Sequence, residues 1–545
     1  MAVVTFDRRE LKELIGRNVS DKELENRVPM MGCDVENVTD DELEVEIFPN
    51  RPDLLSVEGF ARSLKQFLGE GEGVVEYGTT EGELEVKVDG SVEDVRPFIS
   101  AGVVRGVDVD EDILRSLMQA QEKIHTTLGR KRRKVAIGIH DLGGVEGPFT
   151  YKAVEPEEIE FTPLGFKDKV NLLQIKEKHP KGEYAKILEG KKRWPVITDS
   201  EGMVLSFPPV INGVATEVTE ETEDLFIDVT GTDQTAVDQA LNLITSLLAE
   251  RGGTIETVTV DGNVKPEMSP DRIEVDREYI NRLLNLDLSD TEVRESLNRM
   301  GLDYSEGTAV IPCYRVDVMH PMDVVEDVAI GYGYENFEPK IPDVPGIGSS
   351  DEPEEFADRL RDIMMGFGFQ EVINTVLTNK ERQFTMMEED EMDVVETENP
   401  LSEKHCICRR KLLPGILEVF RQNKHRSYPQ RIFEVGDVVI TTENGADNAK
   451  RMSAAITGRK VNYTDIASIL DFLLESLGID YILKEAEGGR FMDSRGAYVL
   501  HGDKEIGSIG EINPEVLENW SLEKPVVSLE LDIEKVMESA DSSIL

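Results

Sequence analysis

Apolar and polar positions between residues 309 and 334 follow two different periods. Residues 309–318, AVIPCYRVDV, alternate and contain a proline, which predicts an edge strand. Beyond them, apolar side chains recur at helical spacing, and two glycines close the pattern: Val324, Val325, Val328, Ala329 and Tyr332, then Gly331 and Gly333. We therefore expect a strand that leads into a short amphipathic helix.

Four acidic residues accompany this strand and helix. Three of them fall on the polar side of the expected helix and one at the end of the strand: Asp323, Glu326 and Asp327, with Asp317 before them. Like charges this close repel one another unless a cation or basic groups lie among them. Oxygen ligands without His or Cys favour Mg²⁺ over zinc. The alternative is a solvated acidic helix face.

The chain carries two copies of one unit. Residues 14–36 align without gaps on residues 283–305, and the repeat continues with small gaps from 48–53 to 311–317 and from 56–61 to 324–329. Each copy predicts a helix, then a second helix that begins after a Ser N-cap and ends at a Gly, and then a hairpin. This order is typical of a helix-turn-helix-like module. Neither second helix is basic, so nucleic-acid binding does not follow. The first copy keeps Asp53 and Glu58 but has Gly59 where the second has Asp327. Only the second copy holds the full acid set.

The remaining pattern divides the chain into four domains and predicts an α+β multidomain protein. We expect an N-terminal module at 1–85, an α/β domain at 91–262, the second module at 268–340 and a second α/β region at 345–545. Segments 71–90 and 339–355 are rich in Gly, Pro or acids and predict linkers. Helices are expected near 236–251, 355–367, 412–424 and 464–477, and strands at 431–440 and 525–533.

Composition restricts the setting in which this chain works. It has 109 acidic and 60 basic residues, a net charge of −49, yet 39% of its 545 residues are hydrophobic. Regular periodicity argues against a disordered acidic chain, so the excess charge coats folded surfaces, as expected in a cytoplasm of very high salt. No secretory signal and no apolar run of 18 residues is present, which predicts a cytoplasmic protein without a membrane span.

Two of the cysteines belong to one further candidate metal site. Four in this length fit a reducing cytosol better than a disulfide framework. His405, Cys406 and Cys408 form an HCIC cluster, for which ordinary packing is favoured over a metal site because a fourth ligand is not evident.

These motifs together resemble the β subunit of phenylalanyl-tRNA synthetase, of the archaeal and eukaryotic type. The resemblance covers nearly the whole chain and rests on NRPDLLSVEGFARSL (50–64) and IPCYRVDVMHPMDVVEDVAIGYGY (311–334). It implies an α2β2 heterotetramer that charges tRNA(Phe), with the ATP and phenylalanine sites on the α subunit. It also implies that Asp317, Asp323, Glu326 and Asp327 bind Mg²⁺ at a site shared with α. The acidic composition suggests a haloarchaeal source.

The resemblance further implies an editing domain at 91–262, which hydrolyses Tyr-tRNA(Phe). A pocket fitted to Phe by apolar shape rejects the extra hydroxyl of Tyr by only about 10²-fold, so a second site is needed. VLSFPPVING (204–213) and LFIDVTGTDQTAV (225–237) carry the pattern of that site. By analogy, the side chains that line the pocket are Ser206, Asn212, Asp228, Thr230 and Thr232. Pro208 and Gly231 are expected to contact the substrate, and Gly231 would let the backbone approach it. The alternative for DVTGTD is a strand and turn that caps the following helix.

Two other features of this domain have open interpretations. The basic run Arg130 to Lys134 is either a solvated loop or a phosphate contact. His140 beside Asp141 suggests an acid/base pair, but adjacent side chains seldom face each other, and a structural role is favoured.

The last region resembles a class II synthetase fold without catalytic residues. Residues 356–372 resemble its dimerisation element and 399–439 its second motif, but RIFEVG keeps only the FE core. The glycine-rich motif ending in arginine is missing. We expect a catalytically silent antiparallel-sheet domain. Two alternatives to an editing subunit remain: a non-enzymatic tRNA-binding scaffold and a free-standing deacylase.

Overall fold

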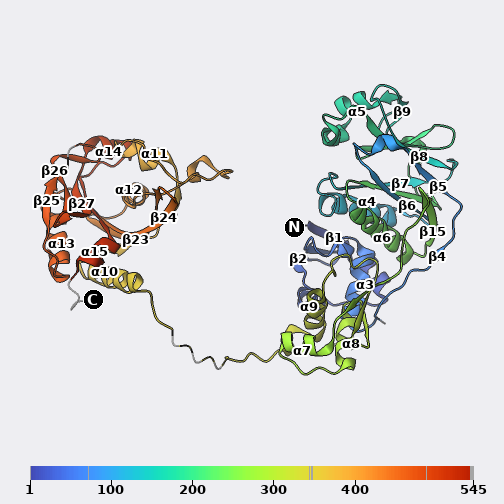
Figure 1. Ribbon diagram of the computed structural model, residues 1–545, viewed down its shortest axis with the longest axis horizontal. Helices are drawn as coiled ribbons and strands as arrows, with labels where there is room; N and C mark the ends of the chain where they lie inside the picture. The colour runs from blue at the N-terminus through green and yellow to red at the C-terminus, as the bar shows by residue number, and fades with distance from the viewer. Residues whose placement is uncertain are drawn as a thin grey trace. The chain divides into compact units, whose positions relative to one another are not determined.

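The computed structural model describes residues 2–71, 73–342, 344, 346, 348–486 and 488–540. The chain forms two units, Met1–Ile341 and Pro342–Leu545, and each is described by itself (Figure 1). The boundary falls within the linker expected at 339–355. Within the described residues, none of the helices combines the length and apolar character needed to cross a membrane.

The two copies of the repeat have the same topology. The first contains β1 (Ala2–Asp7), α1 (Arg8–Ile15), α2 (Asp21–Arg27), β2 (Asp34–Val38), β3 (Glu42–Ile47) and α3 (Val57–Phe67). The second contains β17 (Asp271–Glu274), α7 (Arg277–Leu284), α8 (Asp290–Arg299), β18 (Asp303–Ser305), β19 (Thr308–Ile311) and α9 (Pro321–Tyr332). The sheet orders β1-β3-β2 and β17-β19-β18 correspond strand for strand. Ser20 and Ser289 cap α2 and α8 as expected, each accepting a hydrogen bond from the third backbone N–H of its helix.

The expected edge strand at 309–318 is wrong in two respects. β19 is the central strand of its sheet, and it ends at Ile311. Pro312 follows directly, and its missing N–H removes the donor that would extend the ladder. Asp317 therefore lies in the irregular segment between β19 and α9, not on a strand.

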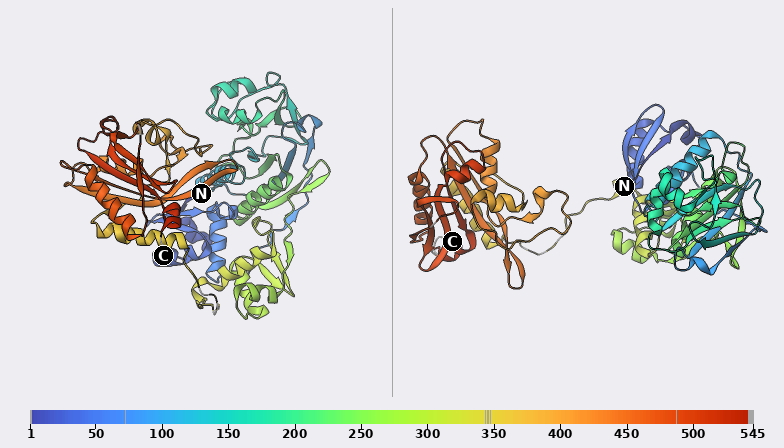
Figure 2. Two further views of the ribbon diagram at one scale, coloured as in Figure 1. Left: turned by 60° about the vertical axis from the view of Figure 1, so that its left-hand side comes forward. Right: turned by 90° about the horizontal axis from the view of Figure 1, so that it is seen from above.

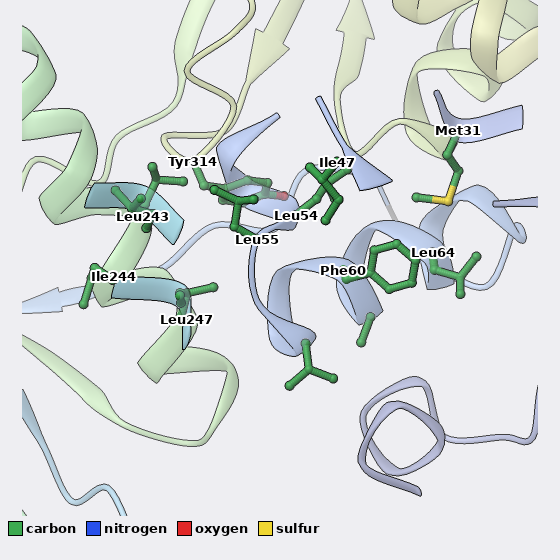
Figure 3. Close-up of a cluster of buried hydrophobic side chains, with 14 of the residues drawn as sticks. Met31, Ile47, Leu54, Leu55, Phe60, Leu64, Leu243, Ile244, Leu247 and Tyr314 are labelled. Carbon is green, nitrogen blue, oxygen red and sulfur yellow. The ribbon is translucent and has the colours of Figure 1, made fainter. Parts of the chain in front are cut away.

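The copies pack on each other and on the middle of the unit. α3 contacts α8, and α9 contacts the short 3₁₀ turn Pro29–Met31 at the end of α2. Within the second copy, α8 and α9 approach so closely that a Cβ on Gly331 would lie 1.9 Å from the carbonyl oxygen of Ser296. Figure 3 shows side chains from three segments in one buried cluster: Leu54, Leu55, Phe60 and Leu64 of the first copy, Leu243, Ile244 and Leu247 of α6, and Tyr314 of the second copy. One continuous core thus joins three of the expected domains.

The middle of the first unit is an eleven-stranded sheet. Its main path is β13-β12-β11-β8-β5-β15-β6-β14-β7, with β4 (Thr79–Thr80) and β16 (Asn263–Lys265) pairing with β15. The path strands are β5 (Glu85–Val88), β6 (Phe98–Arg105), β7 (Val135–Asp141), β8 (Phe149–Val154), β11 (Trp194–Thr198), β12 (Val204–Phe207), β13 (Ile211–Asn212), β14 (Leu225–Gly231) and β15 (Thr254–Val260). The end strands β7 and β13 contact each other, so the sheet curls back on itself.

Helices and a small two-stranded sheet cover this curled sheet. α4 (Glu111–Thr126) packs on β7, and α6 (Gln234–Glu250) packs on β6, β14 and β7. The region after β8 adds β9 (Glu160–Phe161), β10 (Val170–Asn171), α5 (Leu172–Lys178) and the 3₁₀ helix η4 (Pro180–Leu188). α6 matches the helix expected at 236–251.

The second unit is built on a seven-stranded sheet (Figure 2). Its order is β20 (Gln370–Glu371), β23 (Gln430–Thr442), β24 (Gly445–Thr457), β28 (Val526–Asp532), β27 (Lys504–Ile512), β26 (Phe491–His501) and β25 (Ile482–Glu485). Every pair is antiparallel except β20 with β23. A separate pair, β21 (Leu377–Thr378) and β22 (Ile407–Cys408), lies beside it with α11 (Lys380–Gln383).

Helices cover both faces of this sheet. α10 (Glu352–Gly366), α13 (Tyr463–Ser476) and α15 (Ile533–Ser539) bury one face, and α12 (Leu413–Gln422) and α14 (Pro514–Asn519) bury the other. Alternation along β23 separates the faces, because Phe433 joins the first core and Ile432 the second. Three helices and two strands expected here are found within a few residues of their predicted ends.

Candidate functional site

A cavity of about 420 Å³ opens beside the ends of β12, β13 and β14. Its wall includes five of the seven residues expected for the editing pocket: Ser206, Pro208, Asn212, Asp228 and Thr230. They come from two segments that the curl of the sheet brings together, since Asn212 Nδ2 of β13 donates a hydrogen bond to the Ile139 carbonyl of β7 at 3.1 Å. The two motifs therefore meet in one pocket.

Asp228 is held in this wall by the neighbouring strand. It pairs with Gly138 across β14 and β7, and His140 lies two residues further on the same face. His140 Nε2 lies 2.9 Å from Asp228 Oδ2, and its Nδ1 lies 2.7 Å from Thr216 Oγ1. Both side chains are fully buried. Gly138 has no room for a side chain, because its Cβ would lie 2.0 Å from Asp228 Oδ2.

His140 and Asp141 do not form a pair. Adjacent residues of β7 point to opposite faces, and Asp141 Oδ2 instead accepts a hydrogen bond from Thr222 at 2.9 Å. His140 is thus a positioning residue for Asp228.

Ser206 lies in the cavity wall, and its hydroxyl is unpaired. Its side chain is 2% exposed, and its Oγ has no hydrogen-bond partner in the structure. Buried hydroxyls nearly always find a partner, so an unpaired one beside a cavity is a position where a water molecule or a ligand would complete the hydrogen bonding. The orphan lies on β12, opposite Asn212 in the pairing of β12 with β13.

Thr230 is fixed by an arginine that the sequence analysis did not identify. Arg96 Nε donates to Thr230 Oγ1 at 2.9 Å, and its Nη2 donates to the Thr230 carbonyl at 2.7 Å. Its Nη1 donates to the Arg132 carbonyl at 3.2 Å. Burial lowers the pKa of Arg96 to about 10, so it is still charged at neutral pH. Arg96 stands outside both motifs, and only the folded topology shows that it supports the pocket.

Gly231 and Thr232 lie outside the cavity wall, unlike the other expected residues. The close approach at Gly231 is internal, because a Cβ there would lie 2.4 Å from Val237 and 2.6 Å from the Lys134 carbonyl. Thr232 is exposed, and its N–H donates to that same carbonyl. The capping alternative for DVTGTD describes this end, since Asp233 caps α6.

Glu122 of α4 is a second residue that the sequence did not reveal. It lies in the cavity wall, where Arg132 Nη2 donates to its Oε1 at 2.5 Å and Lys181 Nζ at 2.8 Å. His125, Lys181 and Arg132 hold its pKa well below the ordinary range. Arg132 also donates to the Pro209 and Val210 carbonyls at 3.2 and 3.1 Å, and so ties the basic run to the pocket.

The four acids of the second copy are divided between two environments. Arg315, 3% exposed, makes two hydrogen bonds to Asp317 at 2.9 and 2.8 Å and one to Asp327 at 2.7 Å. Burial raises the pKa of Asp327 to about 6. For Asp317 burial acts in the same direction, but Arg315 outweighs it and the pKa is lowered. Arg315 of the same chain therefore supplies the positive charge that Asp317 and Asp327 need in order to lie so close together.

Asp323 and Glu326 lie apart from this pair. Asp323 Oδ2 accepts from the Met319 and His320 N–H groups at 2.8 Å each and so caps α9, while Glu326 is exposed. Among the described residues, the one group of three metal-type ligands within 4.8 Å of one another is Asp34, Glu36 and Glu46 on the first copy. The carboxylate oxygens at 317–327 are of the type that Mg²⁺ prefers, but in this structure the four side chains do not converge on one point.

The first copy repeats the arginine–aspartate pair. Arg51 donates to Asp53 at 2.9 and 2.8 Å, as Arg315 does to Asp317. The two pairs lie close enough to interact. Burial and Arg315 act to lower the pKa of Arg51, but Asp53 and Asp317 outweigh them and the pKa is raised. Asp53 likewise helps to raise the pKa of Arg315. Glu58 of this copy is buried and binds Arg251 at the end of α6 at 2.7 Å.

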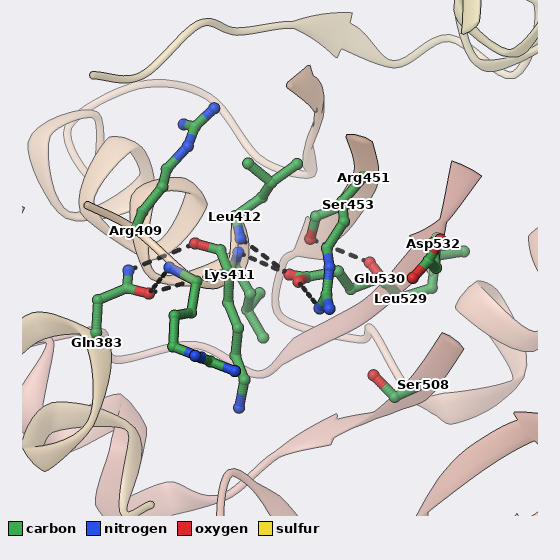
Figure 4. Close-up of polar contacts among 12 residues, drawn as sticks. Gln383, Arg409, Lys411, Leu412, Arg451, Ser453, Ser508, Leu529, Glu530 and Asp532 are labelled. Atoms are coloured by element: carbon green, nitrogen blue, oxygen red, sulfur yellow. Dashed lines mark hydrogen bonds and ion pairs between the residues drawn. The ribbon is translucent and has the colours of Figure 1, made fainter. Parts of the chain in front are cut away.

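In the second unit, basic side chains near the start of α12 are engaged by carboxylates. Arg409 pairs with Glu434 at 2.6 Å, and Lys411 and Arg490 both pair with Glu389. Figure 4 shows Glu530 between Arg451 and the Leu412 backbone; its Oε2 accepts from the N–H groups of Leu412 and Leu413 at 3.2 and 2.9 Å. A nucleotide phosphate would find these cations and this helix N-terminus already occupied.

The HCIC cluster does not form a metal site in the structure. His405 is exposed and Cys406 and Cys408 are free thiols, and among the described residues these three do not form a group of ligands within 4.8 Å of one another. Cys408 belongs to β22, whose pairing with β21 accounts for this segment.

Comparisons with known proteins match three ranges of the chain to described families. Residues 338–533 match the family described as the phenylalanyl tRNA synthetase beta chain CLM domain, 273–334 the tRNA synthetase B5 domain and 115–258 the B3/4 domain. The phenylalanine–tRNA ligase beta subunit of Archaeoglobus fulgidus is 43% identical over 554 aligned residues, covering 99% of this chain and 100% of that protein. That of Pyrococcus abyssi is 42% identical, covering 96% and 97%.

A solved structure matches the first unit. The N-terminal fragment of the phenylalanyl-tRNA synthetase beta-subunit from Pyrococcus horikoshii is 40% identical, with a TM-score of 0.58, and the match covers 61% of this chain and 99% of the fragment. Two of the matched families are described as parts of tRNA synthetases, which sets the class. The chain belongs to the phenylalanine–tRNA ligase β-subunit family.

Proposed function

We propose that the 420 Å³ cavity hydrolyses the ester of tyrosine mistakenly attached to tRNA(Phe), while an α partner performs the ATP-dependent charging with phenylalanine. The observation that carries this proposal is the buried, unpaired hydroxyl of Ser206 in a wall shared with Asp228. A cavity of this size lies within the range of small-ligand sites, about 300–1,000 Å³. It is large enough for an aminoacyl group and too small for a folded RNA.

The chemistry needs a water molecule at the ester carbonyl and a partner for the tyrosyl hydroxyl. In the reaction, water adds to the carbonyl, the ester bond breaks, and free tyrosine and the ribose hydroxyl of the tRNA are released. Asp228 offers a hydrogen-bond acceptor whose orientation His140 holds. Ser206 offers a hydroxyl that can donate or accept. Thr230 and Asn212 complete the polar wall, and Arg96 and Ile139 fix their side chains.

The role of each residue can be separated with two substrates. Asp228→Ala, Ser206→Ala and Asn212→Ala should slow hydrolysis of Tyr-tRNA(Phe) and leave charging with phenylalanine unchanged. A residue that recognises the tyrosyl hydroxyl slows only the Tyr ester, whereas one that positions water slows the Tyr and Phe esters together. Lys460→Ala, an exposed change in the second unit, is the control. Normal editing in both Asp228→Ala and Asn212→Ala would disprove the assignment.

The α2β2 assembly and the Mg²⁺ site belong to the same proposal. Within this chain, Arg315 pairs with both Asp317 and Asp327, so we assign no catalytic step to an ion there. A Mg²⁺ ion at this surface would use Asp323 and Glu326 with water and groups of the α chain, since Mg²⁺ often takes only one or two carboxylates directly. A scaffold without hydrolysis, or a free-standing deacylase, is distinguished by the ester assay and by sizing with and without α.

A further inference from the structure

Two segments near the proposed editing pocket are positively charged, although the chain as a whole is strongly negative. Residues 123–134 contain six basic residues and no acidic one, and residues 167–193 contain nine basic residues against four acidic ones. The chain as a whole carries −49. A surface this acidic repels nucleic acid, so a local positive region determines where a polyanion can approach.

The fold brings these two segments to opposite sides of one groove. A cavity of about 460 Å³ lies between the C-terminal half of α4, the loop that carries the basic run, and η4. Lys131 and Arg133 line one side and Lys186 the other, and all three side chains are exposed. Tyr184, half-buried, supplies an aromatic ring in the same groove, where the guanidinium of Arg132 lies 4.4 Å from the ring centre.

The loop is folded so that its basic side chains divide between the interior and the groove. Arg130, Lys131 and Arg132 have φ values of 48°, 56° and 63°, in the left-handed region that non-glycine residues rarely adopt. Arg132 points inward and binds Glu122 and the Pro209 carbonyl, which leaves its neighbours in sequence on the surface. Strained backbone of this kind concentrates at functional sites.

The groove adjoins the editing pocket directly. Glu122 and Arg132 line both cavities, so a ligand lying in the groove reaches the pocket past these two side chains. A basic surface with an interleaved aromatic ring is the pattern by which proteins bind single-stranded nucleic acid: cations contact the backbone and a base stacks on the ring.

We propose that this groove binds the backbone of the single-stranded 3′ end of an RNA whose terminal ester enters the pocket. Lys131, Arg133 and Lys186 contact phosphates beside the stacked Arg132 and Tyr184 side chains. The proposal rests on the editing function for its purpose, but it can be measured independently.

Binding is measured with the full chain and a fluorescein-labelled eight-nucleotide RNA ending in CCA, by anisotropy over a series of salt concentrations. Lys131→Glu with Arg133→Glu should weaken the affinity at least tenfold and lower the slope of log K against log salt by about 1.4, since each single-strand phosphate contact contributes about 0.7. Lys186→Glu should act in the same direction. The matched control, Lys424→Glu with Lys460→Glu, reverses two exposed lysines of the second unit and should change the affinity less than twofold. Equal weakening by both pairs, or a wild-type chain that does not bind the RNA, overturns the proposal.

Kinetics on Tyr-tRNA(Phe) separate this proposal from the editing assignment. The groove pair should raise KM and spare kcat, whereas Asp228→Ala should lower kcat and leave RNA affinity unchanged. Binding through the groove without hydrolysis would disprove the editing function alone. Hydrolysis with an unchanged KM in the groove pair would disprove the groove alone.

Discussion

His140 and Asp228 meet across two neighbouring strands, with Nε2 of the imidazole 2.9 Å from Oδ2 of the carboxylate. Asp228 pairs directly with Gly138, so His140 reaches it diagonally along the same face of the sheet. The histidine is completely buried, and Thr216 occupies its other nitrogen. These two hydrogen bonds fix the orientation of the Asp228 carboxylate in the cavity wall.

The first prediction concerns the space beside this pair. Gly138→Ala would place a methyl group 2.0 Å from Asp228 Oδ2 and 2.9 Å from His140 Nε2. Asp228 must then turn away, so hydrolysis of Tyr-tRNA(Phe) by the assembled enzyme should fall at least 10²-fold, about 2.7 kcal/mol of barrier. Gly90→Ala, which enters open space, is the control. Undiminished editing by Gly138→Ala would show that Asp228 orientation does not matter.

Arg96 supports both the pocket and the basic loop, and the second prediction tests that double role. Arg96→Met removes its hydrogen bonds to Thr230 and to the Arg132 carbonyl. Hydrogen bonds to charged groups contribute about 1.5–3 kcal/mol each, so the loss of all three should lower the free energy of unfolding in urea by roughly 4.5–9 kcal/mol. Hydrolysis should fall as well. Arg193→Met, an exposed position of the same domain, should leave both unchanged. A stable, fully active Arg96→Met chain would contradict this account.

The third prediction concerns acid sensitivity through His125. Burial lowers the pKa of this histidine to about 4, while its ordinary value is 6.5, and its Nε2 accepts the Ile137 N–H at 2.8 Å. The unfolded chain thus binds the proton more readily, so stability should decline as pH falls from 6.5 to 4, by about 3 kcal/mol in total. His125→Gln should flatten the stability profile in that window. The lowered pKa of Glu122 acts with the same sign but below pH 4.5.

Arg315 is the centre of the fourth prediction. Arg315→Met leaves two buried carboxylates without their cation, and loss of one partner of a buried pair costs about 3–5 kcal/mol. Millimolar Mg²⁺ should not restore the stability of the isolated chain, because the ion does not replace the guanidinium inside the module. Glu326→Gln, on the surface of α9, should spare stability and instead alter Mg²⁺-dependent assembly with α. Rescue of Arg315→Met by Mg²⁺ would show that Asp317 and Asp327 form an ion site.

The sequence-based prediction agrees with the structure where the predicted site residues belong to short contiguous motifs. Ser206, Asn212, Asp228 and Thr230 lie on two short segments, and both segments reach one cavity. Arg96 was missed because it lies far along the chain from Thr230, and only strand order brings the two near. Glu122 was missed because nothing in the sequence of its helix indicates that Arg132 and Lys181 converge on it. The acids at 317–327 were correctly expected to need a positive group, but a pattern of spacing could not show that Arg315 supplies it. Gly231 and Thr232 were assigned by analogy, and the capping geometry at the start of α6 moves them out of the wall.

The fifth prediction addresses the second unit. Its basic side chains at Arg409, Lys411 and Arg490 are paired with glutamates, so we expect the chain alone to show neither ATP binding by calorimetry nor ATP–pyrophosphate exchange. Addition of an α-type chain should restore exchange. Exchange by the isolated chain would contradict the assignment of charging to α.

The most direct test of the central claim is the rate at which the assembled enzyme hydrolyses Tyr-tRNA(Phe), compared between the wild type and Ser206→Ala with Asp228→Ala. The account predicts rapid release of tyrosine by the wild type, at least 10²-fold slower release by the double variant, and equal charging with phenylalanine by both. Equal release of tyrosine by both enzymes, or none by the wild type, would contradict it.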